Sequence, residues 1–431
     1  MTDIGLRSNS PMEVHLINDR EFIPFHRPSI GKEEIAEVVD TLRSGWLTTG
    51  PKTARFEREF SNYVHSPFAL AVNSCTAGLH LALAGLGIGN GDEVITTPLT
   101  FCATVNTILH VGATPVLADV GPNGNIDPNS IEARITPRTK AIIPVHLGGL
   151  PCDLASIWQI AKKRGLRVIE DAAHAAGTLY DEKPIGATNQ DLGTCSDAVA
   201  FSFYATKNLT TAEGGMVTTP DQNLYERMKM LCLHGISRDA WNRYAEKGCW
   251  YYEVHECGFK YNLSDLQSSI GIHQLHKLER SIEIRARHAH LYSTILADVE
   301  EVELPHEALP GDRHAWHLYS IRLNMERLSI DRGQFIEALR EKRIGTSVHF
   351  IPIPLHPFFL PFAKLPHNQC PAALRLYPRL VSLPLYPGMT EAEVEYVGRT
   401  VRELLLASRR RLRPSKPIYI DQPPVLLADA I

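Results

Sequence analysis

The first 220 residues alternate short apolar, β-branched runs with helical stretches, and this alternation constrains the fold more than any other feature. Seven runs have the length and composition of buried strands: Phe68–Val72, Glu93–Thr96, Thr114–Ala118, Ala141–Val145, Arg167–Glu170, Ala198–Ser202 and Gly215–Thr219. Stretches typical of helices separate several of them, namely Ala77–Leu86, Ala103–His110 and Asp153–Arg164. Because strands alternating with helices indicate βαβ units, the sequence predicts an α/β fold with a seven-stranded, mostly parallel sheet between helices.

The pattern changes after about residue 260. Leu263–Ala297 has leucine and isoleucine at helical spacing and is predicted to be one long helical segment. Two strands are predicted near Leu318–Leu323 and Gly345–Phe350, and two helices near Gln334–Lys342 and Glu391–Leu406. We therefore expect a smaller C-terminal α+β domain over residues 263–410. It follows an N-terminal extension over 1–23 and a large domain over 24–262, and precedes a tail over 411–431.

Charge and composition exclude several classes of protein. The chain carries 44 Lys and Arg against 48 Asp and Glu, a net charge of −4, whereas nucleic-acid-binding proteins usually show a basic excess. No apolar run approaches the ~18–20 residues that cross a bilayer, and no basic segment followed by an apolar stretch marks a signal peptide. We expect a cytoplasmic enzyme that binds neither nucleic acid nor membranes.

Cysteine and histidine spacing gives no sign of a metal site. The eight cysteines are scattered and form no CxxC pair. The histidine pairs His288/His290 and His314/His317 have no cysteine or carboxylate partners at metal-ligand spacing. The sequence therefore predicts neither a disulfide framework nor a bound metal ion.

Ligands of α/β sheets bind outside the carboxyl ends of the strands, so the residues that follow strands are the candidates for a site. Asn73–Gly78 lies between the first strand and an apolar helix. Its small residues leave backbone N–H groups free to bind a phosphate, or its hydroxyl residues cap the helix; the residues alone leave both interpretations open. Phe101, after the next strand, either stacks on a flat ring or belongs to the core.

Two charged residues also follow strands. Asp171 ends the run that begins at Arg167, where it either meets a cation of a ligand or caps a helix. Lys207 follows the strand Ala198–Ser202 within small and hydroxyl residues. A lone lysine is usually a solvated surface residue, but burial lowers a lysine's pKa and makes the amine a nucleophile toward carbonyls. A phosphate cup, an aromatic, an acid and a lysine, in this order, predict a site for pyridoxal phosphate.

Several ordered motifs resemble the DegT-type sugar aminotransferase family, whose members are fold-type-I pyridoxal phosphate enzymes. The resemblance extends from about Pro24 to Leu406. The motifs that carry it are Ser44–Pro51, Asn73–Ala77, Asp171–His174, Ser202–Leu209, His234–Ile236, Asn262 within Phe259–Gln267, and Leu383–Pro387.

The resemblance implies a role for each matching residue. Lys207 forms the Schiff base with pyridoxal 5′-phosphate and moves the proton, and Asp171 pairs with the pyridinium nitrogen. Phe101 stacks on the ring, and His174 lies close to it. The phosphate is held by the large domain through Ser74, Cys75, Thr76, Ala77 and Ser202, and by Asn262 of a partner subunit. The functional unit is then a homodimer with shared active sites.

The substrate residues follow the pattern less closely. Trp46, His234 and His349 lie where the family contacts its substrate. Many members have histidine in place of Tyr204 and glycine in place of Ala212. Some relatives are dehydratases in which histidine replaces the Schiff-base lysine, so the retained lysine favours transamination.

The implied function is transfer of an amino group from an amino acid, L-glutamate, to a keto-sugar, nucleotide-linked, by a ping-pong mechanism in amino-sugar, polysaccharide or antibiotic biosynthesis. Alternatives within this family are a cyclitol ketone or an aromatic precursor as substrate, and a pyridoxal phosphate-dependent sugar dehydratase. A pyridoxal phosphate-binding regulator is a further alternative, although the chain shows no helix-turn-helix segment or basic stretch.

Overall fold

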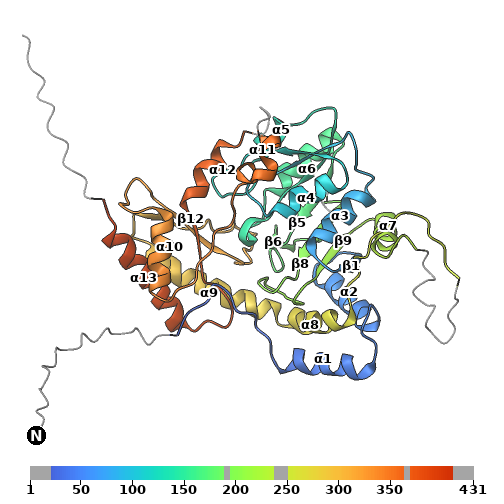
Figure 1. Cartoon of the computed structure of the whole chain (residues 1–431), viewed down its shortest axis with the longest axis horizontal. Coiled ribbons are helices and arrows are strands. Elements are labelled where there is room, and N and C mark those ends of the chain that lie inside the picture. Colours follow the sequence, from blue (N-terminus) through green and yellow to red (C-terminus); the bar gives the residue numbers. More distant parts are fainter. Residues whose placement is uncertain (1–20, 189–194, 237–250, 364–368, 411–431) are drawn as a thin grey trace, which may run out of the picture.

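A seven-stranded sheet forms the centre of the molecule (Figure 1). The computed structural model describes residues 21–188, 195–236, 251–363 and 369–410. The strand order is β1 (Phe68–Val72), β9 (Gly215–Thr219), β8 (Ala198–Ser202), β5 (Arg167–Asp171), β4 (Thr139–Ile143), β2 (Glu93–Thr96) and β3 (Thr114–Leu117). Only β9 runs antiparallel to its neighbours, β1 and β8, in this sheet. All seven predicted strands are present, which confirms the predicted α/β fold with a mostly parallel sheet.

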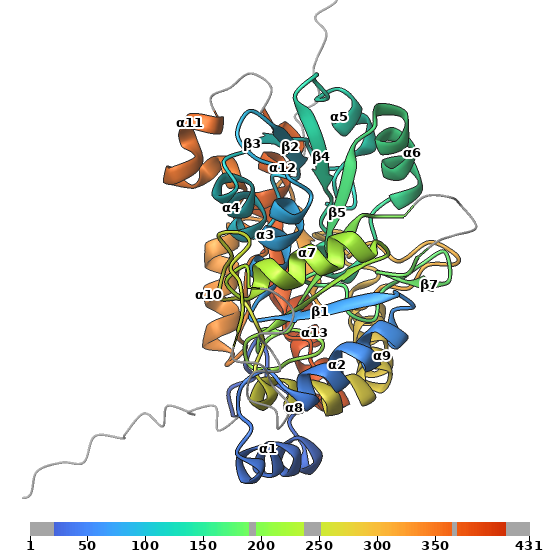
Figure 2. The same ribbon diagram turned by 90° about the vertical axis from the view of Figure 1, so that its right-hand side faces the viewer.

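Helices cover both faces of this sheet, as Figures 1 and 2 show from two sides. One face packs against α2 (Pro51–Tyr63), α6 (Leu154–Arg164) and α8 (Asp265–His276). The other packs against α3 (Cys75–Gly85), α4 (Cys102–His110) and α7 (Gln222–Cys232). Because both faces are buried, the strands carry apolar residues on both sides rather than alternating with polar ones: Val94 belongs to one core and Ile95 to the other.

The C-terminal part is built on a second, antiparallel sheet of β10 (Val302–Glu303), β11 (Tyr319–Leu323) and β12 (Leu380–Leu383). Three helices, α9 (Leu278–Leu296), α10 (Arg332–Glu341) and α13 (Glu391–Ala407), enclose a separate apolar core with this sheet. The predicted smaller α+β unit is therefore present. The domain boundaries drawn from the sequence stay predictions.

Two predicted elements differ from the structure. The long helical segment Leu263–Ala297 is two helices, α8 and α9, because the backbone at Lys277 (φ −103°, ψ 3°) leaves the helical conformation. The predicted strand Gly345–Phe350 is wrong. Ile344 forms one bridge with Ile23, and Ser347 forms one bridge with Ser382, so neither side offers a continuous partner strand.

The N-terminal segment connects the two parts of the molecule. Ile23 forms a parallel bridge with Ile344, and its N–H donates to the Arg343 carbonyl at 2.9 Å. The chain then continues past Phe25 to α1 (Lys32–Ser44), which packs on α8 at the periphery of the molecule (Figures 1 and 2). Among the described residues, no helix is both long enough and apolar enough to span a membrane.

Candidate active site

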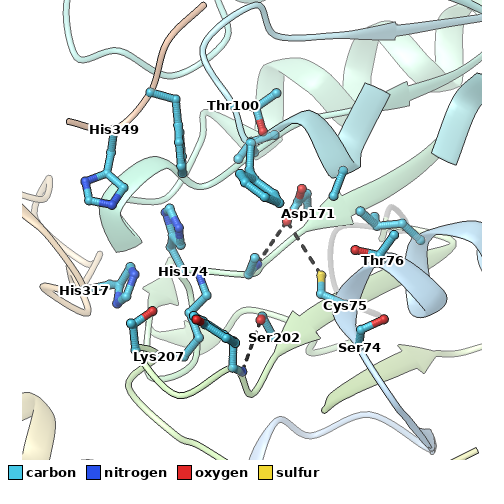
Figure 3. A pocket seen from close by; sticks show the side chains of 18 of the residues that line it. Ser74, Cys75, Thr76, Thr100, Asp171, His174, Ser202, Lys207, His317 and His349 are labelled. Atoms are coloured by element: carbon cyan, nitrogen blue, oxygen red, sulfur yellow. Dashed lines mark hydrogen bonds between the residues drawn. The ribbon is translucent and has the colours of Figure 1, made fainter. Parts of the chain in front are cut away.

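A cavity of about 380 Å³ lies at the carboxyl ends of β5 and β8, between the sheet and the C-terminal part (Figure 3). Its volume falls in the usual range for small-molecule sites. Nine of the predicted site residues line it: Ser74, Cys75, Thr76, Phe101, Asp171, His174, Ser202, Lys207 and His349. The structure therefore gathers these residues, which come from distant parts of the sequence, at one place.

The amino end of α3 opens toward the cavity. Ser74 is the N-cap, and its hydroxyl accepts the N–H of Ala77 at 3.1 Å. The N–H groups of Cys75 and Thr76, at the first two helical positions, have no intrahelical acceptor. The helix cap predicted for Asn73–Gly78 is confirmed, and the two N–H donors that remain leave phosphate binding a prediction.

Asp171 ends β5 and is 5% exposed. Its carboxylate accepts hydrogen bonds from the Thr104 hydroxyl at 2.7 Å and from the Ala173 N–H at 3.1 Å. Burial raises the pKa of Asp171, and these two donors oppose that shift. No helix follows in residues 172–178, so the interpretation of Asp171 as a helix cap is wrong. Within the described residues this buried carboxylate has no ion-pair partner.

Lys207 lies in the turn after β8, where its N–H donates to the Tyr204 carbonyl at 2.9 Å. The side chain lies deep in the protein, and the surface that it keeps accessible faces the cavity. Burial lowers the pKa of Lys207 to about 8, although Cys75 and Asp171 oppose the shift. No group in the described part of the chain forms a hydrogen bond or ion pair with this amine. The interpretation of Lys207 as a solvated surface residue is wrong.

Three histidines line the side of the cavity opposite Asp171 (Figure 3). The rings of His174 and His317 lie 4.4 Å apart between centroids. Burial and the nearby Lys207 lower the pKa of all three, that of His349 to about 4. They are therefore neutral near pH 7. The Nδ1 atom of His174 accepts the Gly148 N–H at 3.2 Å, which assigns its ring proton to Nε2.

Aromatic rings line the rest of this side of the cavity. Phe101 is 60% exposed and lies 6.0 Å from Phe350, so its interpretation as a core residue is wrong. The ring of Phe350 stacks on His174 at 5.7 Å, and that of Phe25 stacks on His349 at 5.4 Å. Phe25, His317 and Phe350 also line the cavity and were not predicted from the sequence. No local motif marks them. The bridges of Ile344 with Ile23 and of Ser347 with Ser382 bring Phe25 and Phe350 here, and backbone hydrogen bonds of Ala315 and Leu318 to Gly149 and Gly148 place His317.

A buried pair behind the cavity supports Asp171. The Nε2 atom of His146 lies 2.8 Å from the Glu170 carboxylate, and its Nδ1 accepts the Cys152 N–H at 3.1 Å. Since a backbone donor faces Nδ1, we assign the ring proton to Nε2. The His146 N–H donates to the Asp171 carbonyl at 3.3 Å. This network fixes the backbone from which the Asp171 side chain projects.

Four predicted residues do not line the cavity of this chain: Ala77, Trp46, His234 and Asn262. The indole N–H of Trp46 donates to the Thr49 carbonyl at 3.1 Å, and the Asn262 amide donates to the Thr49 hydroxyl at 2.7 Å. Any contact of Trp46, His234 or Asn262 with a ligand stays a prediction.

The backbone conformation explains why many family members have glycine where this chain has Ala212. This residue has φ 68°, a conformation that glycine adopts more readily, which accounts for the glycine found there in relatives. The described residues contain no group of three metal-ligating side chains, and the absence of a metal stays a prediction.

Comparison with curated proteins finds long, similar relatives. The uncharacterised protein MJ1066 of Methanocaldococcus jannaschii is 51% identical over 389 residues, covering 90% of this chain and 99% of the relative. The spore coat polysaccharide biosynthesis protein SpsC of Bacillus subtilis is 49% identical over 386 residues, covering 89% and 97%.

Solved structures of aminotransferases have a similar fold over most of the chain. The putative sugar aminotransferase Spr1654 from Streptococcus pneumoniae, in its PLP form, superposes with a TM-score of 0.82 at 33% identity, covering 90% of this chain and 99% of that one. Helicobacter pylori PseC, an aminotransferase involved in the biosynthesis of pseudoaminic acid, gives 0.81 at 31% identity, covering 90% and 100%. Residues 28–402 match one family, so the resemblance drawn from the motifs is confirmed: the chain belongs to the DegT/DnrJ/EryC1/StrS aminotransferase family.

Proposed function

We propose that this sugar aminotransferase moves an amino group from L-glutamate to the keto group of a nucleotide-linked sugar by a ping-pong mechanism. The observation that carries the proposal is the buried Lys207 amine facing the buried Asp171 carboxylate across a cavity at the sheet's edge. The amino-sugar part is supported by relatives whose names refer to spore coat polysaccharide and pseudoaminic acid biosynthesis.

Pyridoxal 5′-phosphate is the cofactor, as the motifs predicted. The residues present fit its three functional groups. The amine of Lys207 matches the aldehyde, and the carboxylate of Asp171 matches the ring nitrogen. The N–H groups of Cys75 and Thr76, with the Ser202 hydroxyl, match the phosphate. The two charged groups thereby gain the partners that the described residues do not give them.

The bound cofactor supplies an aldehyde for covalent attachment and a ring that accepts electrons from the reacting carbon. Burial lowers the pKa of Lys207 to about 8, so about half of the Nζ amine is unprotonated at that pH and can attack carbonyls. We assign to the same atom the transfer of the proton between the substrate carbon and cofactor carbon C4′. Hydrogen bonds from Thr104 and Ala173 oppose the rise that burial causes in the pKa of Asp171, and in this proposal the carboxylate pairs with the protonated ring nitrogen.

The opposite side of the cavity supports a sugar as the acceptor. His317 and His349 offer neutral hydrogen-bonding groups, and Phe25 and Phe350 offer apolar faces. A sugar presents uncharged hydroxyl and carbonyl oxygens beside C–H groups, which such a surface complements. In this proposal His349 contacts the sugar directly, and Trp46 and His234 contact it from the partner subunit.

A homodimer is the proposed functional unit. Helix α1 exposes several large apolar side chains, including Ile35 (59% exposed) and Leu42 (53% exposed). Beside it, an apolar groove of about 330 Å³ also includes Ala205, Ala212 and Ile270. Exposed apolar patches of this kind commonly mark interfaces. We propose that a second copy covers this face and that Asn262 then reaches the partner's phosphate group.

The dimer is tested by sedimentation equilibrium of Ile35→Asp. A charge in the interface should dissociate the dimer and remove turnover, because each site is completed by the other subunit. Glu337→Ala, at an exposed position of α10, serves as the control and should stay dimeric. A monomeric wild-type enzyme with full turnover would refute the shared site.

The function is tested by separating the two half-reactions. Holoenzyme mixed with L-glutamate, L-glutamine or L-alanine should lose its visible cofactor band fastest with glutamate. Keto-sugar nucleotides should then restore the band and yield an amino-sugar by mass spectrometry. A cyclitol ketone or an aromatic precursor that restores it faster would establish the alternative acceptor instead, and a product that has lost water without gaining nitrogen would establish a dehydratase.

A further inference from the structure

A series of hydrogen bonds leads away from the cavity, from the His349 ring to the buried Ser382 hydroxyl and then to the half-buried Ser320 hydroxyl. The Nδ1 atom of this ring lies 2.9 Å from the Ser382 hydroxyl, which lies 2.7 Å from the Ser320 hydroxyl. Ser382 is fully buried, and its backbone exchanges two hydrogen bonds with Ser347. The position of the Ser382 hydroxyl is therefore set by the small sheet, while Phe25 stacks on the other side of the His349 ring.

Each serine has one hydroxyl proton, so the series of hydrogen bonds has two possible directions. In the first, Ser320 donates to Ser382 and Ser382 donates to Nδ1 of His349, which places the ring proton on Nε2. In the second, the ring proton is on Nδ1, His349 donates to Ser382, Ser382 donates to Ser320, and the proton of Ser320 needs an acceptor elsewhere. The surroundings of the Ser320 hydroxyl, at the end of the series remote from His349, decide between the two directions.

The Ser320 hydroxyl lies at a second, smaller cavity of about 40 Å³, whose lining also includes Arg322 and His306. Arg322 lies two residues after Ser320 on β11, so both side chains project from the same face of the strand. Its guanidinium, in a residue 8% exposed, donates to the Pro122 carbonyl, and none of the described carboxylates pairs with it. Glu303, opposite on β10, pairs with Arg379 instead.

A buried cation at this end opposes a hydroxyl proton that points toward it and favours the oxygen lone pairs instead. The Nε2 atom of His306 lies 3.1 Å from the Pro122 carbonyl and 3.4 Å from Nη1 of Arg322. In either tautomer this nitrogen is engaged, by donating to the carbonyl or by accepting from the guanidinium, so it offers no free lone pair to Ser320. The charge of Arg322 therefore turns the Ser320 proton away from the small cavity and toward Ser382. The first direction is favoured.

We propose that Ser320 and Ser382 are positioning residues that hold His349 as its Nε2–H tautomer, so that this ring donates a hydrogen bond to an uncharged oxygen of the acceptor substrate. The inference rests on the proposed function in that the acceptor enters this cavity. It narrows the substrate class to molecules with a keto or hydroxyl oxygen at the His349 position.

The electrostatics of the ring agree with a neutral donor. Burial, followed by the charge of Lys207, lowers the pKa of His349 to about 4, so the ring carries one proton throughout the neutral range. A site built to hydrogen-bond a substrate oxygen strongly rejects an analogue that lacks that oxygen, because the buried donor is then left unpaired. A deoxy acceptor should therefore bind less tightly than its parent.

The tautomer is measured directly by ¹⁵N NMR of histidine-labelled holoenzyme, with His349 assigned from the signals that disappear in His349→Gln. The wild type should show a protonated Nε2 and an unprotonated Nδ1. Ser382→Ala should give a mixture of tautomers and raise KM for the acceptor about tenfold, as expected from loss of about 1.4 kcal/mol. The rate of the half-reaction with L-glutamate should stay unchanged, and Ser320→Ala should show a smaller change in the same direction.

Ser293→Ala is the matched control. It removes a partly buried hydroxyl pair, Ser293 with Tyr319, from the same part of the molecule without touching His349. Its KM and its His349 spectrum should equal those of the wild type. If Ser382→Ala does not fold, the wild-type tautomer and Ser320→Ala decide the matter alone.

A wild-type ring protonated on Nδ1 would overturn the inference, as would equal effects of Ser382→Ala and Ser293→Ala. The outcomes also separate the two proposals. An Nε2–H ring in an enzyme that aminates no keto-sugar refutes the proposed function and leaves the positioning role standing. An Nδ1–H ring in an active sugar aminotransferase refutes the positioning role alone.

Discussion

The two sides of the cavity differ in origin and in charge. The strand-end wall, formed by Ser74–Thr76, Asp171 and Lys207, comes from segments that directly follow strands of one sheet. The cap wall, formed by Phe25, His317, His349 and Phe350, comes from the N-terminal segment and the C-terminal part. The strand-end wall holds a buried carboxylate and a buried amine, whereas the cap wall holds neutral imidazoles and aromatic rings.

We expect the two walls to affect different half-reactions of the transamination. Both half-reactions of a transamination use the same cofactor, so the wall with the charged groups should affect both. His317 and His349 in the cap wall are neutral at neutral pH, and we assign to this wall the recognition of the acceptor alone. Variants in the two walls should therefore separate into those that impair both half-reactions and those that impair only the step with the acceptor.

The largest effect is expected from Lys207→Ala. Removing the amine that attaches the cofactor and moves the proton should lower the rates of both half-reactions by at least about 10³-fold. Stopped-flow spectroscopy with L-glutamate, and then with the keto-sugar, measures each rate. Lys163→Ala, at an exposed ion pair, should leave both rates unchanged. Loss of only the acceptor step would break the division between the walls.

Asp171→Asn should have the next largest effect. Removing one partner of a buried charge pair costs about 3–5 kcal/mol, which corresponds to a decrease of about 10²- to 10⁴-fold in both half-reactions. The hydrogen bond from Thr104 can persist to the asparagine oxygen, so the fold should survive. Circular dichroism checks the fold, and stopped-flow rates check the chemistry. Unchanged rates would exclude a role for Asp171 at the ring nitrogen.

The pH dependence of cofactor capture should report on the same wall. Burial lowers the pKa of Lys207 to about 8, and only the unprotonated amine attacks an aldehyde. Apoprotein should therefore capture pyridoxal phosphate slowly below pH 8, and the rate should rise with a midpoint near 8 and then level off. Because Asp171 raises this pKa, Asp171→Asn should move the midpoint to lower pH. A midpoint near 10.5 would show a solvated lysine.

Phe25→Ala should give the smallest effect and the clearest sign of a divided cavity. Loss of its stacking on His349 removes about 0.5–1.5 kcal/mol, which corresponds to a rise of about 2- to 12-fold in KM for the acceptor. The rate with L-glutamate should not change. Steady-state kinetics with each substrate varied in turn makes the comparison, and an equal effect on both substrates would place Phe25 in the machinery of both steps.

The strand-end wall was predictable from the sequence because its residues belong to short motifs, each following a recognisable strand. The seven strands gave the sheet, and the carboxyl ends of its strands gave the location of Asp171 and Lys207. Burial of the lysine, which decides its chemistry, could be inferred only from its place after an apolar strand and from the family resemblance, since no neighbouring cation in the sequence marks it.

The cap wall was not predictable in the same way. Phe25 reaches the cavity only because Ile23 pairs with Ile344, two positions separated by most of the chain. The segment Gly345–Phe350 has the composition of a strand, yet within it only Ser347 forms a bridge, with Ser382. The residues that follow Ser347 place His349 and Phe350 in the cavity. Trp46, His234 and Asn262, assigned from motifs, lie outside the cavity of a single chain.

The attachment of the cofactor to Lys207 is tested most directly by reducing the holoenzyme with borohydride and mapping the modified peptide by mass spectrometry. We predict one modified residue, Lys207, and no modification after prior incubation with L-glutamate, which transfers its amino group to the cofactor and releases the lysine. Modification of another lysine, or full transamination by an enzyme with an unmodified Lys207, would contradict the account.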